Sequence, residues 1–277
     1  MRDADVPAAE EVARAAFADL DRRAGRDPHP PGPSDWAYVR VRRILATDPG
    51  GCWVAEADDG AVVGSALALV REGVWGLSRL VVAPGHQSGG LGRELLRRAL
   101  AHGDDAPGGI IPASSDPRAL RAYARAGFRL EPALSASGTP SAALAPDPAV
   151  RGFAPGDHPL AAAVDREVRG AAHGADLDAL LAGGCHGLTL PGRGYAITRA
   201  DELKLLAARD DEAAAVLLRA AIAAAPGQAR VDWITARQAW AVDVVLDAGL
   251  ALGPGGAVCL RGDVGPFRPY LPSGAYL

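Results

Sequence analysis

The chain opens with a helical pattern of apolar positions and continues with strand-like patterns. Residues 5–21 repeat apolar positions every three to four residues, and Asp5 can cap a helix there. After a loop rich in Pro and Gly at residues 24–35, residues 36–46 predict a second helix. Three apolar runs then predict strands at residues 52–57, 61–70 and 75–83. The turn Asp58-Asp59-Gly60 predicts that the first two strands form a hairpin.

Helices and strands alternate in the next part of the chain. The pattern predicts a helix at 90–102, a strand at 109–113, a helix at 117–126 and a strand from Phe128. Mixed strands and helices in this order are typical of an α/β or α+β domain. Residues 134–148 contain few large apolar side chains and much Ser, Ala and Pro, so we interpret about 139–148 as a linker.

Similar elements recur after the linker. The pattern predicts helices at 156–168 and 175–182, strands within 194–207, a helix at 211–225, a strand at 229–235, a helix at 237–248 and a final strand. Two short motifs repeat at one offset of 122 positions: Leu95-Leu96-Arg97 recurs as Leu217-Leu218-Arg219, and Ala126-Gly127-Phe128 recurs as Ala248-Gly249-Leu250. The sequence therefore predicts a duplicated fold, with one domain at residues 1–138 and a second at residues 149–277.

Composition excludes several classes of protein. Of the 277 residues, 49% are hydrophobic, which is enough for large cores and argues against global disorder. The net charge of -4 gives no basic surface for nucleic acid, and no uncharged apolar run is long enough to span a bilayer. Cys52, Cys185 and Cys259 lack metal-ligand spacing, so we expect no metal site. The N-terminus has no apolar signal region, and a cytoplasmic protein without a membrane or nucleic-acid partner is expected.

A glycine-rich turn follows the third predicted strand. Residues 81–96 read VVAPGHQSGGLGRELL, in which a strand passes through glycines into a helix. Backbone N–H groups at the start of such a helix bind anions, and glycines let that backbone approach the anion closely. A P-loop would need Gly-Lys-Ser/Thr, and a dinucleotide fingerprint would need a third glycine where Leu95 stands. The turn therefore predicts an anion site of another kind.

Two motifs together resemble one enzyme family. Residues 87–92, Gln-Ser-Gly-Gly-Leu-Gly, match the pattern Q/R-x-x-G-x-G/A, and they are referred to as the glycine turn. Residues 116–128 resemble N-x-x-A-x-x-x-Y-x-x-x-G-F, with Asp116 in place of the usual Asn. Both are similar to segments of the GNAT superfamily of N-acetyltransferases, over residues from about 5 to 135. The resemblance implies two GNAT-like domains, each a mixed, mostly antiparallel sheet flanked by helices, arranged as a pseudo-dimer that is monomeric or pairs again as a homodimer.

The resemblance also implies a reaction and the residues that perform it. Acetyl-CoA would be the cosubstrate, and a primary amine, expected to be a small molecule, would attack its thioester through a tetrahedral intermediate. Tyr123 would protonate the departing thiolate. Asp116 would contact the cofactor, or it would cap the helix that Pro117 begins. The other cofactor-binding residues would be Leu80, Val81 and Val82 along the pantetheine arm, and Gln87, Ser88, Gly89, Gly90, Leu91, Gly92 and Arg93 around the pyrophosphate.

The second half lacks these residues. At the same offset, Gln87, Gly90, Gly92 and Tyr123 are replaced by Arg209, Glu212, Ala214 and Val245. Asp210, Asp211 and Glu212 place negative charge where the helix starts, and this charge would repel an anion. We therefore expect the second domain to be a degenerate copy that does not bind the cofactor.

The group that takes the proton from the amine is not assigned. Some members of the family carry a Glu on the strand before the turn, whereas this strand has Ser78 and Arg79, and its first carboxylate is Glu72. A water relay, a residue of the second half and an already neutral amine all stay open. The missing carboxylate also motivates an alternative function, a non-catalytic acyl-CoA-binding sensor. Protein N-termini or lysines are further acceptors, and a slightly acidic protein suits a cationic amine such as an amino sugar or a polyamine.

Two features of the second half have no assigned role. The polar run Asp165 to His173 is interpreted as capping charges with a surface histidine, and the alternative is a base that acts near neutral pH. The apolar tail, residues 269–277, is expected to dock on the body of the protein. If residues 150–277 bound a partner protein instead, they would expose a large apolar patch.

Overall fold

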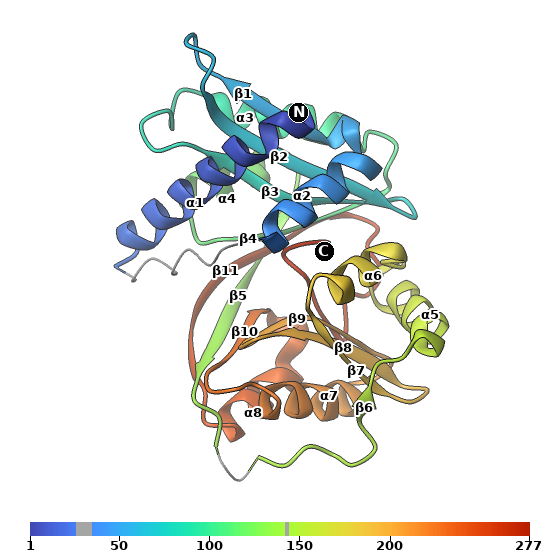
Figure 1. The fold of residues 1–277 in the computed structure, drawn as a ribbon. Helices are drawn as coiled ribbons and strands as arrows, with labels where there is room; N and C mark the ends of the chain where they lie inside the picture. Colours follow the sequence, from blue (N-terminus) through green and yellow to red (C-terminus); the bar gives the residue numbers. More distant parts are fainter. Residues whose placement is uncertain (26–34, 142–143) are drawn as a thin grey trace. The chain divides into compact units, whose positions relative to one another are not determined.

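The computed structural model describes residues 1–25, 35–141 and 144–277. The chain forms two compact units, Met1–Ala106 and Pro107–Leu277, whose elements are labelled in Figure 1. Most of the loop expected at residues 24–35 lies outside the described residues.

The first unit is an antiparallel sheet with helices on both faces. Its strands pair in the order β1–β2–β3. On one face, Trp75 donates its indole N–H to the backbone oxygen of Ala99 in α3 at 3.0 Å. On the other face, Val81 packs against Ala13 and Ala16 of α1. The elements are α1 (Val6–Arg23), α2 (Asp35–Thr47), β1 (Cys52–Glu56), β2 (Val62–Arg71), β3 (Val74–Val82) and α3 (Leu91–Ala101).

The second unit is built on a larger sheet. Its strands follow the order β4–β11–β5–β10–β9–β8–β7–β6, with β12 paired to β9. Neighbouring strands are antiparallel except β9 and β10, which makes the sheet mixed. The strands are β4 (Gly108–Ala113), β5 (Arg129–Gly138), β6 (Arg151–Gly152), β7 (His186–Leu190), β8 (Gly194–Arg199), β9 (Glu202–Ala208), β10 (Ala229–Ile234), β11 (Ala251–Gly262) and β12 (Tyr270–Leu271). The helices are α4 (Pro117–Arg125), α5 (His158–Arg169), α6 (Ala175–Ala182), α7 (Asp211–Ala223) and α8 (Ala239–Asp247).

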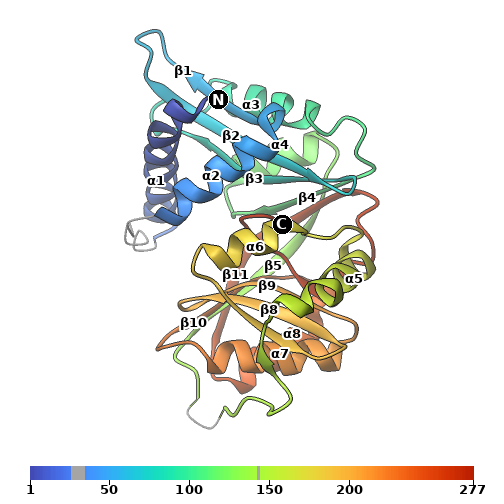
Figure 2. The same cartoon turned by 45° about the vertical axis from the view of Figure 1, so that its right-hand side comes forward.

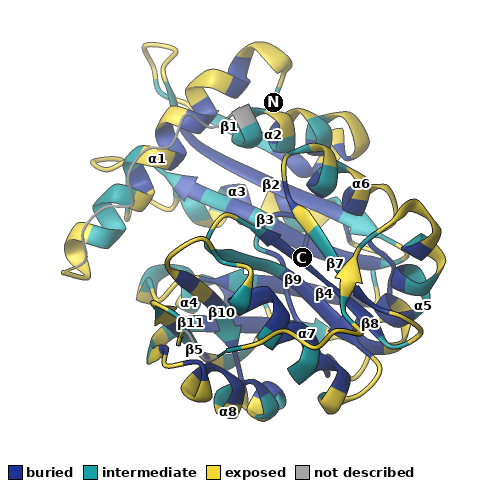
Figure 3. Ribbon diagram, turned by 60° about the horizontal axis from the view of Figure 1, so that its bottom comes forward, coloured by how far each residue is buried: buried dark blue, intermediate teal, exposed yellow. Residues whose placement is uncertain are grey.

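Helices also cover the sheet of the second unit, and its core lies between them. Figures 1 and 2 show α5 and α6 over one face, with α7 and α8 over the other. The core under α7 includes Leu217, Leu218 and Ile222, which pack with Leu206 of β9 and Val244 of α8. Figure 3 shows the buried positions along the strands and the exposed outer sides of the helices.

The element order confirms the predicted duplication of the fold. Two helices, three strands, a helix, a strand, a helix and a strand follow one another in each half, apart from the short extra strands β6 and β12. α4 begins at Pro117 and α8 at Ala239, while β5 begins at Arg129 and β11 at Ala251. Both pairs keep the offset found between the repeated motifs, so the last helix and the last strand of the two halves correspond residue by residue.

The last strands of the two halves are exchanged. β11, from the second half, lies between β4 and β5 of the first half, where Cys259 is opposite Ile111 on one side and Leu130 on the other. β5 in turn pairs with β10. This exchange explains why the compact units divide after Ala106 rather than in the linker. The described residues within 139–149 lie outside helices and strands, and the domains 1–138 and 149–277 stay a prediction about the duplicated segments.

The C-terminal tail docks on the second unit, as expected. Tyr270 and Leu271 pair with Ala207 and Leu206 of β9. The side chains of Tyr276 and Leu277 are buried as well. The tail therefore completes the core of this unit.

Candidate active site

The glycine turn is held in shape by its own backbone and by one side chain. β3 ends at Val82 and α3 begins at Leu91. Between them, Ser88 and Gly90 have positive φ angles of 70° and 88°, which is rare for a serine. The side-chain amide of Gln87 donates to the backbone oxygen of Val82 at 3.0 Å and ties the turn to the end of the strand. Gln87 therefore shapes the turn from the protein side.

The space around the glycines is open. A Cβ atom built at Gly89 would have no neighbour within 4 Å, and one at Gly90 would approach only the end of the Arg93 side chain, at 3.9 Å. A Cβ at Gly92 would stand 3.6 Å from Val82. Gly90 is the N-cap of α3, and no side chain among the described residues caps this helix. The first N–H groups of α3 are thus available to an anion.

The one acidic side chain in the first turn of α3 is already neutralised. Glu94 accepts hydrogen bonds from Arg97 at 2.7 Å and from Arg98 at 2.8 Å. These bonds, first the one from Arg97, lower the pKa of Glu94 to about 2. Negative charge at this helix start is therefore compensated by two guanidinium groups, and an incoming anion meets no unpaired carboxylate from Glu94.

β3 carries a β-bulge before the glycine turn. Leu67 of β2 is opposite Arg79, and the next residue, Ala68, is opposite Leu77, so Ser78 is the extra residue of β3. A bulge reverses the alternation of side chains along a strand. Trp75 accordingly contacts α3, whereas Arg79 contacts α1 on the opposite face.

A carboxylate that the sequence analysis missed lies against this strand. Glu10 of α1 accepts a hydrogen bond from Nη1 of Arg79, and the exposed fractions of the two side chains are 9% and 1%. The signal was present in the sequence, since Glu10 falls among the apolar positions of its helix. A buried carboxylate needs a partner of opposite charge, and Arg79 of the strand before the glycine turn supplies it.

Tyr123 and Asp116 belong to the second unit. Tyr123, on α4, is 5% exposed, and burial, followed by the neighbouring Cys259 and Asp116, raises the pKa of its phenol. The phenol is therefore protonated at neutral pH and able to act as an acid. Asp116 is the N-cap of α4: its carboxylate accepts from the backbone N–H of Arg118 at 2.9 Å and from the Arg118 guanidinium at 2.7 Å. The capping role of Asp116 is thus observed, while its contact with a cofactor stays a prediction.

In the second half, acidic side chains occupy the corresponding helix start. Asp210, the N-cap of α7, accepts from the backbone N–H of Ala213 at 2.8 Å. This hydrogen bond lowers the pKa of Asp210, and the hydrogen bond and positive charge of Arg193 lower it further. Together they outweigh the partial desolvation of the carboxylate, which would raise the pKa. Arg193 also contacts Glu212 at 2.9 Å, and Arg268 contacts Asp211. The protein's own carboxylates thus stand where α3 leaves open space.

The interpretation of His173 as a surface residue was wrong. His173 and Asp165 are each 1% exposed, and Nδ1 of His173 lies 2.8 Å from Oδ2 of Asp165. Tyr195 donates its hydroxyl to the other oxygen of Asp165 at 2.6 Å, and Nε2 of His173 contacts the backbone oxygen of Leu277. Because the partner Leu277 lies in the tail, local sequence could not reveal this burial. The network fastens the tail to the second unit.

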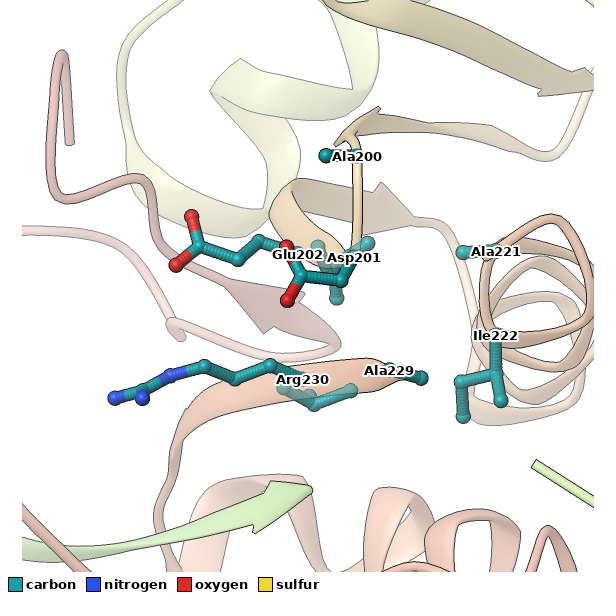
Figure 4. Close-up of a pocket in the computed structure, with 9 residues that line it drawn as sticks. Ala200, Asp201, Glu202, Ala221, Ile222, Ala229 and Arg230 are labelled. Carbon is teal, nitrogen blue, oxygen red and sulfur yellow. The ribbon is translucent and has the colours of Figure 1, made fainter. Parts of the chain in front are cut away.

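A small pocket of the second unit is shown in Figure 4. It lies at the starts of β9 and β10, beside the end of α7, with Asp201, Glu202 and Arg230 at its rim. Its volume of about 10 Å³ is the room of a single water molecule. This pocket cannot hold a substrate.

Two further searches concern the described residues. No described helix is long and apolar enough to cross a membrane. In the same residues, no group of three or more His, Cys, Asp and Glu side chains is placed to hold a metal ion.

Comparison with known proteins finds one family model that matches part of the chain. Residues 15–128 match the family model described as the Acetyltransferase (GNAT) family. A search of curated proteins found no match. Among solved structures, a proposed acetyltransferase from Pyrococcus horikoshii is 16% identical, with a TM-score of 0.80 over 100% of this chain and 93% of its own.

Two other solved structures have the same architecture. A GCN5-related N-acetyltransferase from Sphaerobacter thermophilus is 18% identical, with a TM-score of 0.60 over 99% of this chain and 96% of its own. A tandem GNAT protein from the clavulanic acid biosynthesis pathway is 14% identical, with a TM-score of 0.52 over 92% of this chain and 94% of its own. Likeness at such low identity concerns the fold, and it supports two GNAT-like domains along the chain.

Proposed function

The chain carries a GNAT-family domain at residues 15–128, and from this premise we propose that the protein is an acetyl-CoA-dependent N-acetyltransferase acting on a primary amine of a small molecule. The observation that carries the proposal is the open start of α3, where glycines leave backbone N–H groups uncapped directly after β3. Such a helix start suits the pyrophosphate of coenzyme A.

The residues of the first unit fit this cosubstrate. Gly89, Gly90 and Gly92 leave the space that a pyrophosphate needs, and the side chain of Arg93 ends beside Gly90. Leu80, Val81 and Val82 form the last part of β3 and would guide the pantetheine arm with their backbone groups. The proposed pyrophosphate site is thus continuous with the proposed pantetheine site along one strand and one turn.

The proposed reaction is direct transfer. The neutral amine attacks the thioester carbonyl, a tetrahedral intermediate forms, and the C–S bond breaks as the amide forms. Tyr123 gives its proton to the departing thiolate; burial raises the pKa of its phenol, which keeps the proton in place at neutral pH but makes the group a weaker acid than an exposed tyrosine. The amine loses one proton, which passes to water or to a basic side chain. The second half supports the fold and takes no cosubstrate.

The test is a comparison of two matched glycine variants. Gly89 and Gly227 both lack a positive φ angle and both have open space where a Cβ would be. Gly89→Asp places a carboxylate in the proposed pyrophosphate site, whereas Gly227→Asp places one in a loop of the second unit. Calorimetry with acetyl-CoA should give one site per chain for the wild type and for Gly227→Asp, and no measurable binding for Gly89→Asp.

Other outcomes separate the alternatives. Two sites per chain would contradict the degenerate second half, and no binding to the wild type would end the acetyltransferase proposal. If the protein binds acetyl-CoA but releases no free CoA with any amine of a broad panel, the result would favour the acyl-CoA sensor. Acetylation of peptide N-termini or lysines in preference to small amines would move the acceptor class to proteins.

A further inference from the structure

One edge of the Arg79 guanidinium, formed by Nε and Nη2, is buried in the first unit and donates no hydrogen bond to a described residue. The side chain of Arg79 is 1% exposed, and its one hydrogen bond runs from Nη1 to Glu10. Within the described residues, Nε and Nη2 of Arg79 have no hydrogen-bond partner, and neither has the buried hydroxyl of Ser65. Buried donors are almost always paired, so three such atoms close to one another need an explanation.

Other arginines of this chain show what that edge can bind. Arg237 donates from Nε and Nη2 to the two oxygens of Glu131, both at 2.7 Å. Arg118 uses the same two nitrogens toward Asp116, at 3.1 Å and 2.7 Å. A carboxylate matches the Nε–Nη2 edge with two parallel hydrogen bonds. Arg79 is far more buried than Arg237 or Arg118, yet no described residue accepts a hydrogen bond from the same edge.

The position of this edge connects it with the proposed reaction. Arg79 is three residues before Val82, which corresponds to about 10 Å along the strand. Ser65 pairs with Val81, and Arg79 pairs with Leu67, so Ser65 and Arg79 are diagonal neighbours on the face toward α1. The two unpaired nitrogens of Arg79 therefore lie on the strand that would guide the pantetheine arm, and the Ser65 hydroxyl lies on the neighbouring strand β2.

The charges at this place favour a particular ligand. Glu10 already balances Arg79, so a bound carboxylate would add one negative charge to a buried region. An ammonium group on the same ligand would neutralise that charge, and loss of its proton would yield the amine that reacts. Because both nitrogens are closed to solvent, the packing around Arg79, which includes α1 through Glu10, must open to admit the ligand.

We propose that the Nε–Nη2 edge of Arg79, together with the hydroxyl of Ser65, binds the carboxylate of the acceptor. The acceptor is then an amino acid or another amine that carries a carboxylate. This inference rests on the proposed acetyl transfer and narrows its acceptor class.

A binding experiment tests the subsite without turnover. The full-length protein, labelled with ¹⁵N at arginine Nε, is titrated with the twenty standard L-amino acids and their C-terminal amides, without acetyl-CoA. The Arg79 signal is assigned by its loss in Arg79→Lys. At least one amino acid should shift this signal saturably while its amide does not. An unmoved signal, or an equal shift by the amide, would overturn the proposal and leave the edge to buried water.

Turnover gives the second measurement. For the amino acid that binds, kcat/KM should exceed that of its amide on the order of 100-fold, because the amide leaves a buried guanidinium edge unpaired. Arg79→Lys keeps the positive charge beside Glu10 but lacks the paired Nε and Nη2 donors. In this variant the kcat/KM ratio of the amino acid to its amide should fall to below about 10-fold. Ser65→Ala should lower it by a few fold. In the matched control Arg237→Lys, whose edge is filled by Glu131, the ratio should not change.

The failures are distinguishable. A saturable Arg79 shift without any acetylation would retain the carboxylate subsite and remove the proposed function. Acetylation at equal rates with and without the carboxylate would retain the function and remove the subsite.

Discussion

The two copies of the helix that follows the third strand begin in opposite ways. The N-cap of α3 is Gly90, whose backbone is left-handed, and no side chain among the described residues caps this helix. The N-cap of α7 is Asp210, whose carboxylate caps the helix and contacts Arg193. Their inner faces nevertheless use the same buried pair, Leu95-Leu96 in α3 and Leu217-Leu218 in α7.

This difference separates two requirements on one helix. The inner face must pack against the sheet, and apolar side chains at helical spacing satisfy that need in both halves. The start of the helix has unpaired N–H groups, which need either a side-chain cap or an external anion. One copy meets this need with Asp210, and in the proposed function the other would meet it with the bound cosubstrate.

The largest expected effect concerns Tyr123, whose counterpart in the second half is Val245. Tyr123→Phe removes the acid that would protonate the thiolate, and kcat should fall by about 100-fold or more. The affinity for acetyl-CoA and the unfolding temperature should change little, because the ring still fills its buried place. A measurement of free CoA release, with calorimetry beside it, checks both statements. Unchanged kcat would remove Tyr123 from the mechanism.

Copying the second half's helix start into the first should abolish most of the cosubstrate binding. In Gly90→Glu with Gly92→Ala, the new carboxylate faces the proposed pyrophosphate, and the dissociation constant should rise on the order of 100-fold. The positive φ angle of Gly90 makes any side chain there strained, so Gly90→Ala with Gly92→Ala is the control for strain without charge. Equal losses in the two variants would show that shape, rather than charge, decides the binding.

Asp5 before α1 and Asp157 before α5 occupy corresponding places in the two halves, and Asp157 predicts that the free energy of unfolding depends on pH. Asp157 accepts two hydrogen bonds from Arg151, both at 2.7 Å, and the pKa of its carboxyl is lowered to about 2. A carboxyl whose pKa is lower in the folded protein than in the unfolded chain stabilises the fold at pH values above its unfolded-state pKa. This stabilisation is lost as the pH falls toward the folded-state pKa. We expect a loss of about 1 kcal/mol between pH 4 and pH 2, which Asp157→Asn should remove. Urea unfolding at several pH values measures it, and Asp5→Asn, before α1, is the counterpart variant.

The smallest expected effect concerns the cap of α7. Asp210→Ala leaves the N–H of Ala213 without its side-chain acceptor and should lower the free energy of unfolding by about 0.5 kcal/mol. Gly227→Ala, in an open loop, serves as the control for urea unfolding. Acetyl-CoA should still bind at one site in Asp210→Ala. A second site in this variant would mean that charge alone keeps the second half empty.

Periodic and turn signals predicted the first half well. Each of its predicted helices and strands begins within two residues of the expected position, and each one whose end was predicted also ends within two residues of it. These elements have a strong apolar period and clear turn residues between them, so local sequence determines them. In the second half, β7 was missed because it is only five residues long and Gly187 weakens its strand pattern.

The features that the sequence could not predict depend on distant partners. The place of β11 between β4 and β5 is chosen by sheet pairing over long distances in the chain. The bulge at Ser78 decides that Arg79 faces α1, and one residue fewer would turn it toward α3. The glycine turn and Tyr123 were assigned from motifs, whereas the pairing of Glu10 with Arg79 and the two unpaired nitrogens of Arg79 required the structure.

The exchanged strand also has a consequence for how the protein is made. Ile111 pairs with Cys259, and the residues between them emerge from the ribosome over roughly 10 to 30 seconds at the usual rates of synthesis. During that time the edge of β4 that β11 will occupy is exposed on the nascent chain. Pro112, the fifth of the six residues of β4, has no N–H to donate, so this strand offers one ladder hydrogen bond fewer to a wrong partner.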